Sequence, residues 1–339
     1  MIVLGIESTC DETSVSIVQD GKEVLSNIVA SQIKDHAPWK GVVPEIASRL
    51  HLKKIIPITE QAVSEANITL DKIDLVAASN RPGLIGGLIV GVSTAKAIAW
   101  YLNKPFIGIN HMDAHLYSPH ITNNIPFPYI GLLVSGGHTL IVVAKSYTDY
   151  EVIGTTIDDA VGEAFDKIAK FYDIGYPGGP AVEKCALDGN ETAFDFPISN
   201  LYKSDRKFDV SYSGLKTAVI NHLKKYQKTE NYTSADIAAS FQKRAFDVLY
   251  KKISSAVKKY KINTVVVAGG VSANKYLRKM FDSLHNCNVY FPQLKYATDN
   301  GAMIAAFAYH KFKESGPTSL SEGVYPRVEG FKISLMQDK

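Results

Sequence analysis

The chain is poor in cysteine, and its thiols lack the spacing that a disulfide framework or a structural zinc site needs. Cys10, Cys185 and Cys287 are odd in number and far apart, whereas such sites use paired cysteines. The opening residues MIVLGIES form an apolar run without the basic segment and cleavage site of a secretory signal. The sequence therefore predicts a cytoplasmic protein in a reducing compartment.

A strong charge of one sign and a clean membrane span are also missing. The 37 Lys and Arg residues against 34 Asp and Glu residues leave a net charge of +3, which permits a polyanionic partner without identifying one. The most apolar stretch, residues 84–102, contains glycines, hydroxyl residues and Lys96, which argues against a membrane span. With 339 residues, 46% of them hydrophobic, we expect a globular protein of two domains and no membrane contact.

One pattern of strand, polar turn and strand occurs twice. It is present at residues 2–18 and again at 129–144. A further strand at 264–268 runs into Gly269-Gly270 and a helix, which is an arrangement that holds phosphate. Either polar turn alone is more often structural than functional, but together these features indicate an α/β protein of the actin-like ATPase (ASKHA) fold, with two duplicated lobes, a central nucleotide cleft and helical insertions.

The domain boundaries follow from this duplication. We expect residues 1–108 with 302–330 to form the N-terminal lobe and residues 109–301 to form the C-terminal lobe. Signals between 158 and 260 are mostly helical, which predicts a helical insertion in the second lobe.

A pair of histidines is the main candidate for metal binding. His111 and His115 are four residues apart in HMDAH, so on a helix both imidazoles share one face and can converge on a metal. A structural pair of helix histidines is the alternative. Met112 stands where the HExxH motif of zinc proteases has its glutamate, which opposes a metalloprotease. Thr298 and Asp299 precede an apolar run, where either residue can cap a helix and the Asp299 carboxylate can point into the cleft.

A cluster of lysines is a candidate RNA contact. Lys251, Lys252, Lys258, Lys259 and Lys261 lie within eleven positions of a predicted helix and its end. Such a run either binds phosphates or is a solvated helix face.

Ten segments, in order and from end to end, together resemble the bacterial TsaD family (formerly YgjD or Gcp) of tRNA N6-adenosine threonylcarbamoyltransferases. The segments are GIESTCDETSVSIV at 5–18, GVVPEIASRLH at 41–51, PGLIGGLIVG at 82–91, HMDAH at 111–115, LVSGGHT at 133–139, DDAVGEAFDK at 158–167, YPGGP at 176–180, SYSGLKTAV at 211–219, AGGVSANKYLR at 268–278 and TDNGAM at 298–303. Lys40 and Arg81 depart from the commoner glycine of the family, and neither departure removes a proposed ligand.

The resemblance implies a set of site residues. His111, His115 and Asp299 are expected to coordinate one divalent metal ion per subunit, Fe²⁺ or Zn²⁺. Asp11 and Glu12 are candidate catalytic residues that take the amine proton or order the site. The expected substrate-binding residues are Val134, Ser135, Gly136, Gly137, His138, Asp166, Gly179, Glu183 and Asn274.

The resemblance also implies an activity and partners. The threonylcarbamoyl group would pass from threonylcarbamoyl-AMP to N6 of adenosine 37 in tRNAs that read codons beginning with A, with release of AMP. A TsaC-type synthase would supply the threonylcarbamoyl-AMP, and TsaB-type and TsaE-type proteins would assist turnover. The alternatives are an ATPase of the same fold and a scaffold subunit that pairs through the apolar helix at 91–101. A bound metal and transfer to tRNA distinguish the enzyme from both.

Overall fold

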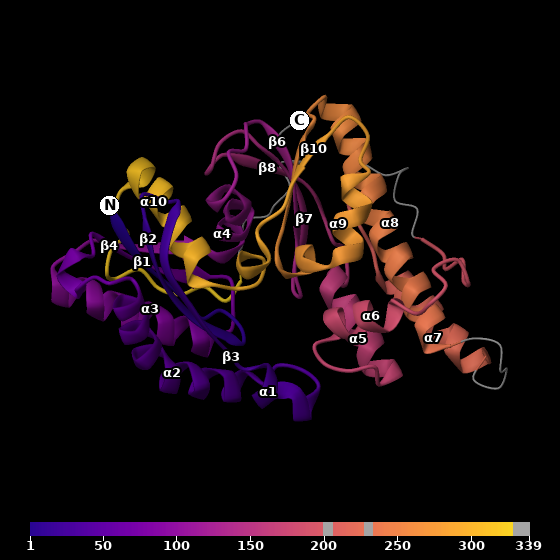
Figure 1. Cartoon of the computed structure of the whole chain (residues 1–339), viewed down its shortest axis with the longest axis horizontal. Coiled ribbons are helices and arrows are strands. Elements are labelled where there is room, and N and C mark those ends of the chain that lie inside the picture. Colours follow the sequence, from indigo (N-terminus) through magenta and orange to yellow (C-terminus); the bar gives the residue numbers. More distant parts are fainter. Residues whose placement is uncertain (199–205, 227–232, 328–339) are drawn as a thin grey trace, which may run out of the picture. The chain divides into compact units, whose positions relative to one another are not determined.

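The computed structural model describes residues 1–198, 206–226 and 233–327, and these form two compact units with one five-stranded sheet each (Figure 1). Unit 1 comprises Met1–Ile125, Tyr147–Asp149 and the described residues from Pro292 onward, and unit 2 comprises Pro126–Ser146 and Tyr150–Phe291. The sequence-based boundary at residue 108 differs from this division, because helix α4 (His111–Tyr117) packs on helix α10 (Gly301–Ser315) within unit 1.

The sheet of unit 1 has the strand order β3-β2-β1-β4-β5. Strand β2 is antiparallel to both β1 and β3, whereas β4 is parallel to β1 and to β5. The strands are β1 (Ile2–Glu7), β2 (Glu12–Gln19), β3 (Glu23–Ser31), β4 (Leu75–Arg81) and β5 (Phe106–Asn110).

The sheet of unit 2 repeats this topology. Listed from the edge strand β8, its order is β8-β7-β6-β9-β10. Strand β7 is antiparallel to both neighbours, and β9 is parallel to β6 and β10. The strands are β6 (Tyr129–Val134), β7 (Thr139–Ala144), β8 (Tyr150–Thr155), β9 (Thr264–Ala268) and β10 (Asn288–Tyr290). The predicted duplication is confirmed, since both sheets are mixed and have the same arrangement of parallel and antiparallel neighbours.

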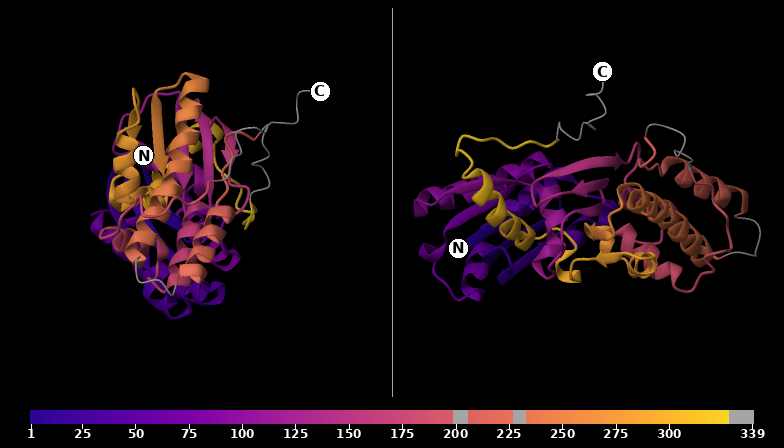
Figure 2. Two further views of the ribbon diagram at one scale, coloured as in Figure 1. Left: turned by 90° about the vertical axis from the view of Figure 1, so that its right-hand side faces the viewer. Right: turned by 90° about the horizontal axis from the view of Figure 1, so that it is seen from above.

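Helices cover both faces of the first sheet, as the alternating side chains of β1 require. Leu4 and Ile6 belong to the hydrophobic cluster that α2 (Pro44–Glu65) and α3 (Ile85–Leu102) complete on one face. Val3 and Gly5 face α10 on the other side. Figures 1 and 2 show α10 in yellow against the indigo strands.

Helix α3 is the one described helix that is long and apolar enough to span a membrane by length and composition. A third of this stretch (33%) is buried, and those residues pack against β4 and α2 within unit 1.

Helix α8 (Ser234–Tyr260) organises the core of unit 2. It starts at a capping box, where Thr233 Oγ1 accepts from the Asp236 N–H at 3.1 Å and Asp236 Oδ2 accepts from the Thr233 N–H at 3.0 Å. Its aromatic residues Phe241 and Phe246 pack on Phe165. The other helices of unit 2 are α5 (Val161–Tyr172), α6 (Gly178–Ala186), α7 (Ser213–Tyr226) and α9 (Lys275–Asp282).

Short helical turns complete the fold. They are α1 (Ile33–His36) and the 3-10 helices η1 (Ala37–Trp39), η2 (Leu70–Lys72), η3 (Ser118–Ile121), η4 (Gly270–Ala273) and η5 (Leu294–Tyr296). Helix η4 begins directly after Gly269, whose φ of 89° is in the left-handed region.

The close approach of β1 and α10 generates the first prediction. A Cβ on Gly5 would lie 2.5 Å from the Ala305 nitrogen and 2.6 Å from the Gly301 oxygen, both of them backbone atoms. Gly5→Ala should therefore lower the free energy of unfolding by about 1–3 kcal/mol, the usual cost of overpacking, as measured by denaturant titration. Gly41→Ala is the matched control, since a Cβ there meets nothing within 4 Å. Equal stability of the two variants would contradict this packing.

Candidate metal centre and substrate-binding residues

The local fold of unit 1 places the two histidines on one face of a helix. Asn110 ends β5 and caps α4, because its Oδ1 accepts from the Met112 N–H at 2.9 Å. His111 and His115 then occupy successive turns of α4, with ring centroids 4.5 Å apart. Both histidines are buried, so the histidine pair predicted from HMDAH forms part of the interior of unit 1.

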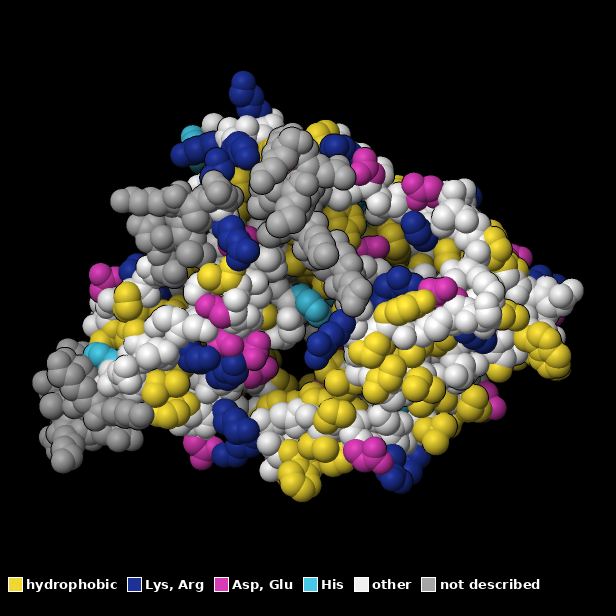
Figure 3. Space-filling model, turned by 180° about the vertical axis from the view of Figure 1, so that it is seen from behind, with side chains coloured by type: hydrophobic (Ala, Val, Ile, Leu, Met, Phe, Trp, Pro, Cys, Tyr) yellow, Lys and Arg dark blue, Asp and Glu magenta, His cyan; other side chains and the backbone are white. Residues whose placement is uncertain are grey.

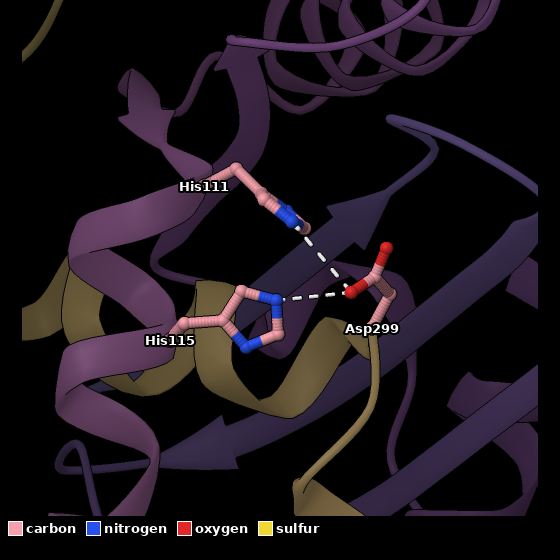
Figure 4. A group of neighbouring side chains, drawn as sticks. All are labelled: His111, His115 and Asp299. Carbon is pink, nitrogen blue, oxygen red and sulfur yellow. Dashed lines mark hydrogen bonds and ion pairs between the residues drawn. The ribbon is translucent and has the colours of Figure 1, made fainter. Parts of the chain in front are cut away.

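The third group of the cluster comes from the chain before α10. Asn300 caps α10 by accepting from the Met303 N–H at 3.0 Å, and the Gly301 N–H donates to Ser14 Oγ at 2.8 Å. These bonds fix the start of α10 against β2. Asp299, the residue before the cap, is thereby directed toward the histidines (Figure 4).

The donor atoms of this cluster have the separations of ligands that share an ion. His115 Nε2 lies 2.9 Å and His111 Nε2 lies 3.6 Å from Asp299 Oδ1 (Figure 4). Ligand atoms each about 2 Å from a common zinc ion have spacings of this order. Two imidazoles and one carboxylate also form a donor set that suits Fe²⁺ and Zn²⁺. The residues therefore fit a divalent metal ion.

Glu7 orients one of the two imidazoles. Its Oε2 lies 2.9 Å from His111 Nδ1, on the opposite side of the ring from the nitrogen that faces Asp299. Glu7 is fully buried and also accepts hydrogen bonds from the Thr9 N–H at 2.7 Å and from Ser79 Oγ. A carboxylate behind a ligating histidine fixes the ring and raises its basicity.

The sequence analysis missed Glu7, although one signal could have identified it. Glu7 is an acidic residue at the end of an otherwise apolar buried strand. Acidic side chains are almost never fully buried unless they are paired.

Burial and charge act in opposite directions on the pKa values of this cluster. Burial alone lowers the pKa of His111, but the negative charges of Glu7 and Asp299 outweigh it and raise the pKa to about 9. Burial raises the pKa of Glu7, and the charge and hydrogen bond of His111 reverse this and lower it. His111 therefore holds a proton that a metal ion must displace.

The first polar turn, between β1 and β2, carries Asp11, and Glu12 follows it as the first residue of β2. Burial raises the pKa of Glu12 well above its usual range, and the nearby charges of Asp299 and Asp11 raise it further. Two residues outside the turn contact its backbone. His51 Nε2 lies 3.0 Å from the Cys10 oxygen, and the Gln32 N–H donates to the Asp11 oxygen at 2.9 Å.

Two glycines of α3 allow this helix to approach the same turn. A Cβ on Gly87 would lie 2.2 Å from the Ser8 backbone oxygen, and a Cβ on Gly91 would lie 2.1 Å from Ser8 Oγ. The Ser8 hydroxyl instead donates to the Gly87 oxygen at 2.9 Å. The glycines of the PGLIGGLIVG segment thus allow the first polar turn to pack directly against α3.

The second polar turn, in unit 2, is tight and open to one side. The Ser135 N–H donates to the His138 oxygen at 2.9 Å, and the His138 N–H donates to Ser135 Oγ at 3.1 Å. A Cβ on Gly136 or Gly137 would meet nothing within 4 Å. Val134, just before the turn, contacts the glycine turn after β9, since a Cβ on Gly269 would lie 2.4 Å from the Val134 oxygen.

The remaining predicted substrate residues lie on α5, on α6 and before α9. Asp166 Oδ1 accepts from the Gly178 N–H at 2.8 Å at the start of α6, and Gly179 follows with open space at its Cα. Glu183 Oε1 accepts from the Lys275 N–H at 2.7 Å.

Asn274 is already engaged on both sides of its amide. Its Oδ1 caps α9 by accepting from the Leu277 N–H at 3.0 Å, and its Nδ2 donates to Gln242 Oε1 at 2.9 Å. Gln242, a buried residue of α8, was not predicted, because a single glutamine within a long helix carries no motif. A groove of about 350 Å³ beside these groups is lined by Glu183, Gln242 and Lys275, among others.

Most of this chain is similar in sequence to one family of known proteins. The family profile of TsaD, described as tRNA N6-adenosine threonylcarbamoyltransferase, matches residues 23–306. Proteins of that name from Treponema denticola and from Borrelia garinii subsp. bavariensis are 51% identical over 332 residues and 46% identical over 340 residues. These alignments cover 98% of both chains in the first case and 100% of both in the second.

Solved structures with much lower sequence identity share the fold alone. Full-length HypF in its phosphate- and nucleotide-bound form superposes with a TM-score of 0.62 at 17% identity, over 94% of this chain and 47% of HypF. Component A of the Acidaminococcus fermentans (R)-2-hydroxyglutaryl-CoA dehydratase superposes with a TM-score of 0.53 at 14% identity, over 92% of this chain and 98% of that chain.

The hydrogen bond between Glu7 and His111 generates a prediction for metal affinity. Glu7→Gln should weaken binding of Fe²⁺ or Zn²⁺ by about 10–100-fold, the usual effect of removing such a partner. In the wild type, affinity should rise with pH until His111 has lost its proton near pH 9. In the variant the rise should end at a lower pH, because the charge that raises the pKa of His111 is gone.

The measurement is a competition titration with a chelator at several pH values. Asp20→Asn is the control, since it removes a carboxylate of unit 1 that is 58% exposed. Unchanged affinity and an unchanged pH profile in Glu7→Gln would exclude this role of Glu7.

Proposed function

Since this chain belongs to the tRNA N6-adenosine threonylcarbamoyltransferase family, it forms N6-threonylcarbamoyladenosine in tRNA, and we propose a division of this acyl transfer between the residues of the two units. The threonylcarbamoyl carbon of threonylcarbamoyl-AMP loses its bond to the phosphate oxygen and gains a bond to N6 of adenosine 37, in tRNAs that read codons beginning with A. AMP leaves and the amine loses a proton.

The metal centre is assigned to unit 1. His111 Nε2, His115 Nε2 and Asp299 Oδ1 hold one divalent ion, Fe²⁺ or Zn²⁺, and Glu7 fixes the ring of His111. A bound ion would act as a Lewis acid toward an oxygen of the threonylcarbamoyl group. The single observation that carries this assignment is the convergence of the three side chains, from segments 184 residues apart, on one point.

Unit 2 is assigned to the adenylate. The open backbone of the second polar turn suits an anionic group, because Gly136 and Gly137 let a phosphate approach the main-chain N–H groups. This stabilises the AMP leaving group as the bond to carbon breaks. Asp166, Gly179 and Asn274 bind the adenosine, and the bond to Gln242 holds Asn274 in place for it. Val134, Ser135 and His138 belong to the turn that holds the phosphate, and Glu183 is assigned to the ribose.

Asp11 and Glu12 are assigned two roles. One is to accept the proton of the adenosine amine, and the other is to hold the groups of the site in place. The lone pair of the exocyclic amine is delocalised into the ring, which makes N6 a weak nucleophile. N6 must therefore lose a proton as it attacks the threonylcarbamoyl carbon. The raised pKa of Glu12 favours a protonated side chain that donates a hydrogen bond. Asp11 is then the carboxylate that accepts the amine proton.

The partners are proposed from the family and from one surface of unit 1. We expect a cytoplasmic protein that receives threonylcarbamoyl-AMP from a TsaC-type synthase and works with TsaB-type and TsaE-type proteins. Hydrophobic side chains gather over α2 and α3 at the lower right of Figure 3. On α3, Ile85, Ile89, Trp100 and Tyr101 are exposed, and we assign this face to the TsaB-type partner. No comparison favours an ATPase or a scaffold without transferase activity.

Removal of a ligand tests the metal assignment. His111→Ala and Asp299→Ala should each lose bound metal and at least about 100-fold in transfer rate, since three side chains supply all the protein ligands. Metal content is measured by mass spectrometry, and product by digestion of tRNA incubated with threonylcarbamoyl-AMP and the partner proteins. Asp113→Ala, on another face of α4, is the matched control. Full transfer by metal-free His111→Ala protein would refute the assignment.

Charge on the exposed face of α3 tests the partner assignment. Ile89→Glu combined with Trp100→Glu should abolish the complex with a TsaB-type protein in size-exclusion chromatography and should leave the melting temperature unchanged, because these side chains are 50% and 76% exposed. Leu187→Glu is the control, because Leu187 is an equally exposed apolar residue of unit 2. A complex that forms as in the wild type would show that the partner binds elsewhere.

A further inference from the structure

A basic groove that the proposed chemistry does not use lies at one end of unit 2. It has a volume of about 850 Å³ and is bounded by the last turns of α8, the residue before β9 and the segment between α9 and β10. Lys251, Lys258, Lys261 and His285 line it together with Ser254 and Ser255, and none of the lining residues is acidic. Figure 3 shows Lys and Arg side chains gathered near the top of the molecule, left of centre, which is the region where α8 ends in Figure 1.

The lysines of the groove differ from the others in the same sequence run. Lys252 is buried, and its Nζ donates to the Lys207 oxygen at 2.6 Å. Lys259 Nζ lies 5.3 Å from the ring centre of Phe208 and 5.0 Å from that of Tyr260. The five lysines of the run therefore divide into a structural pair and the three that line the groove.

The arrangement of the three groove lysines favours one concentrated positive surface. Lys251 and Lys258 are seven residues apart and so share a face of α8. Lys261 follows at the left-handed end of the helix, with a φ of 55° that turns the chain toward β9. Across the described residues none of the three forms an ion pair with a carboxylate. Lysines on an ordinary solvated helix face would instead point separately into solvent and would not line a groove between neighbouring elements.

The groove is distant from the residues that are assigned to the adenylate. On α8, Gln242, the partner of Asn274, lies nine positions before Lys251 and sixteen before Lys258, which corresponds to about 14 Å and about 24 Å along a helix. The groove also lies at the start of β9, whereas Gly269 lies just after its end. A ligand of the groove is therefore either separate from the adenylate or large enough to extend past it.

We propose that this groove binds backbone phosphates of the tRNA, away from the adenosine that is modified. The inference rests on tRNA as the substrate of the proposed function. Three lysines neutralise phosphates and so release their counterions, and the Ser254 hydroxyl donates a hydrogen bond to a phosphate oxygen, whereas the Ser255 hydroxyl donates to the Lys251 oxygen at 2.8 Å. None of these contacts reads a base, which suits an enzyme that must accept several tRNAs of different sequence.

Charge reversal inside the groove tests the proposal. Lys251→Glu combined with Lys258→Glu should raise the Kd for unmodified tRNA at least about tenfold at low salt. It should also reduce the slope of log K against log salt by about 0.7–0.9 for each phosphate that the variant no longer neutralises. The kcat at saturating tRNA should not change, because neither lysine touches the adenylate. Binding is measured by fluorescence anisotropy with the full chain at several salt concentrations.

The matched control makes the same change in net charge elsewhere. Lys53→Glu combined with Lys72→Glu reverses two exposed lysines of unit 1 and should leave both the Kd and the salt slope unchanged. If the groove variant binds tRNA as tightly as this control and with the same slope, the proposal is wrong. If it binds tRNA normally but no longer binds a purified partner protein, the groove serves an acidic protein surface and the proposal is also wrong.

A second measurement uses the unaltered protein. Cys287 lines the groove and is partly exposed, so bound tRNA should slow its alkylation at least about threefold, and threonylcarbamoyl-AMP alone should not. Alkylation at the same rate with and without saturating tRNA would overturn the proposal. Wild-type protein that binds tRNA here but forms no product would count against the transfer function and not against the groove.

Discussion

The buried contact of Glu7 with His111 is the interaction on which the chemistry of unit 1 depends. It joins the end of β1 to the start of α4 and leaves the other ring nitrogen of His111 facing Asp299. Its geometry requires two further constraints. Gly5 lets α10 lie against β1, and the bond of Gly301 to Ser14 fixes the start of α10, so that Asp299 lies where the histidines converge. Close packing of the backbone and placement of the proposed metal ligands are thus parts of one arrangement.

The two units show how one topology carries different chemistry. Each has a turn at the same place, between the first two strands of its sheet. In unit 1 this turn is surrounded by carboxylates and histidines, and burial raises the pKa of Glu12 there. In unit 2 the corresponding turn contains Gly136 and Gly137, with open space around both. A concentration of negative charge suits a cation, and exposed main-chain N–H groups suit an anion. The repeat of the fold therefore does not imply a repeat of the binding site.

The sequence predicted the repeated core because periodicity and turn residues act locally. The central strands, α8 and the helical pairing of His111 with His115 were all confirmed. The edge strands β3, β8 and β10 were not identified, because half-exposed strands carry a weaker pattern. Asp299 could be joined to the histidines only through the family resemblance, since no local rule connects side chains 184 residues apart. The roles of Glu7 and Lys252 depend on tertiary contacts, which a local sequence pattern does not reveal.

The central claim is that two imidazoles and one carboxylate, and no thiolate, hold the metal ion. Cys10 is the thiol nearest in sequence to Glu7, and burial raises its pKa well above the usual range, which disfavours the thiolate that a metal binds. X-ray absorption spectroscopy of the metal-loaded protein tests this most directly. The account predicts a first shell of nitrogen and oxygen at about 2.0–2.2 Å with the scattering pattern of two imidazoles, whereas a sulfur ligand at about 2.3 Å, or fewer than two imidazoles, would contradict it.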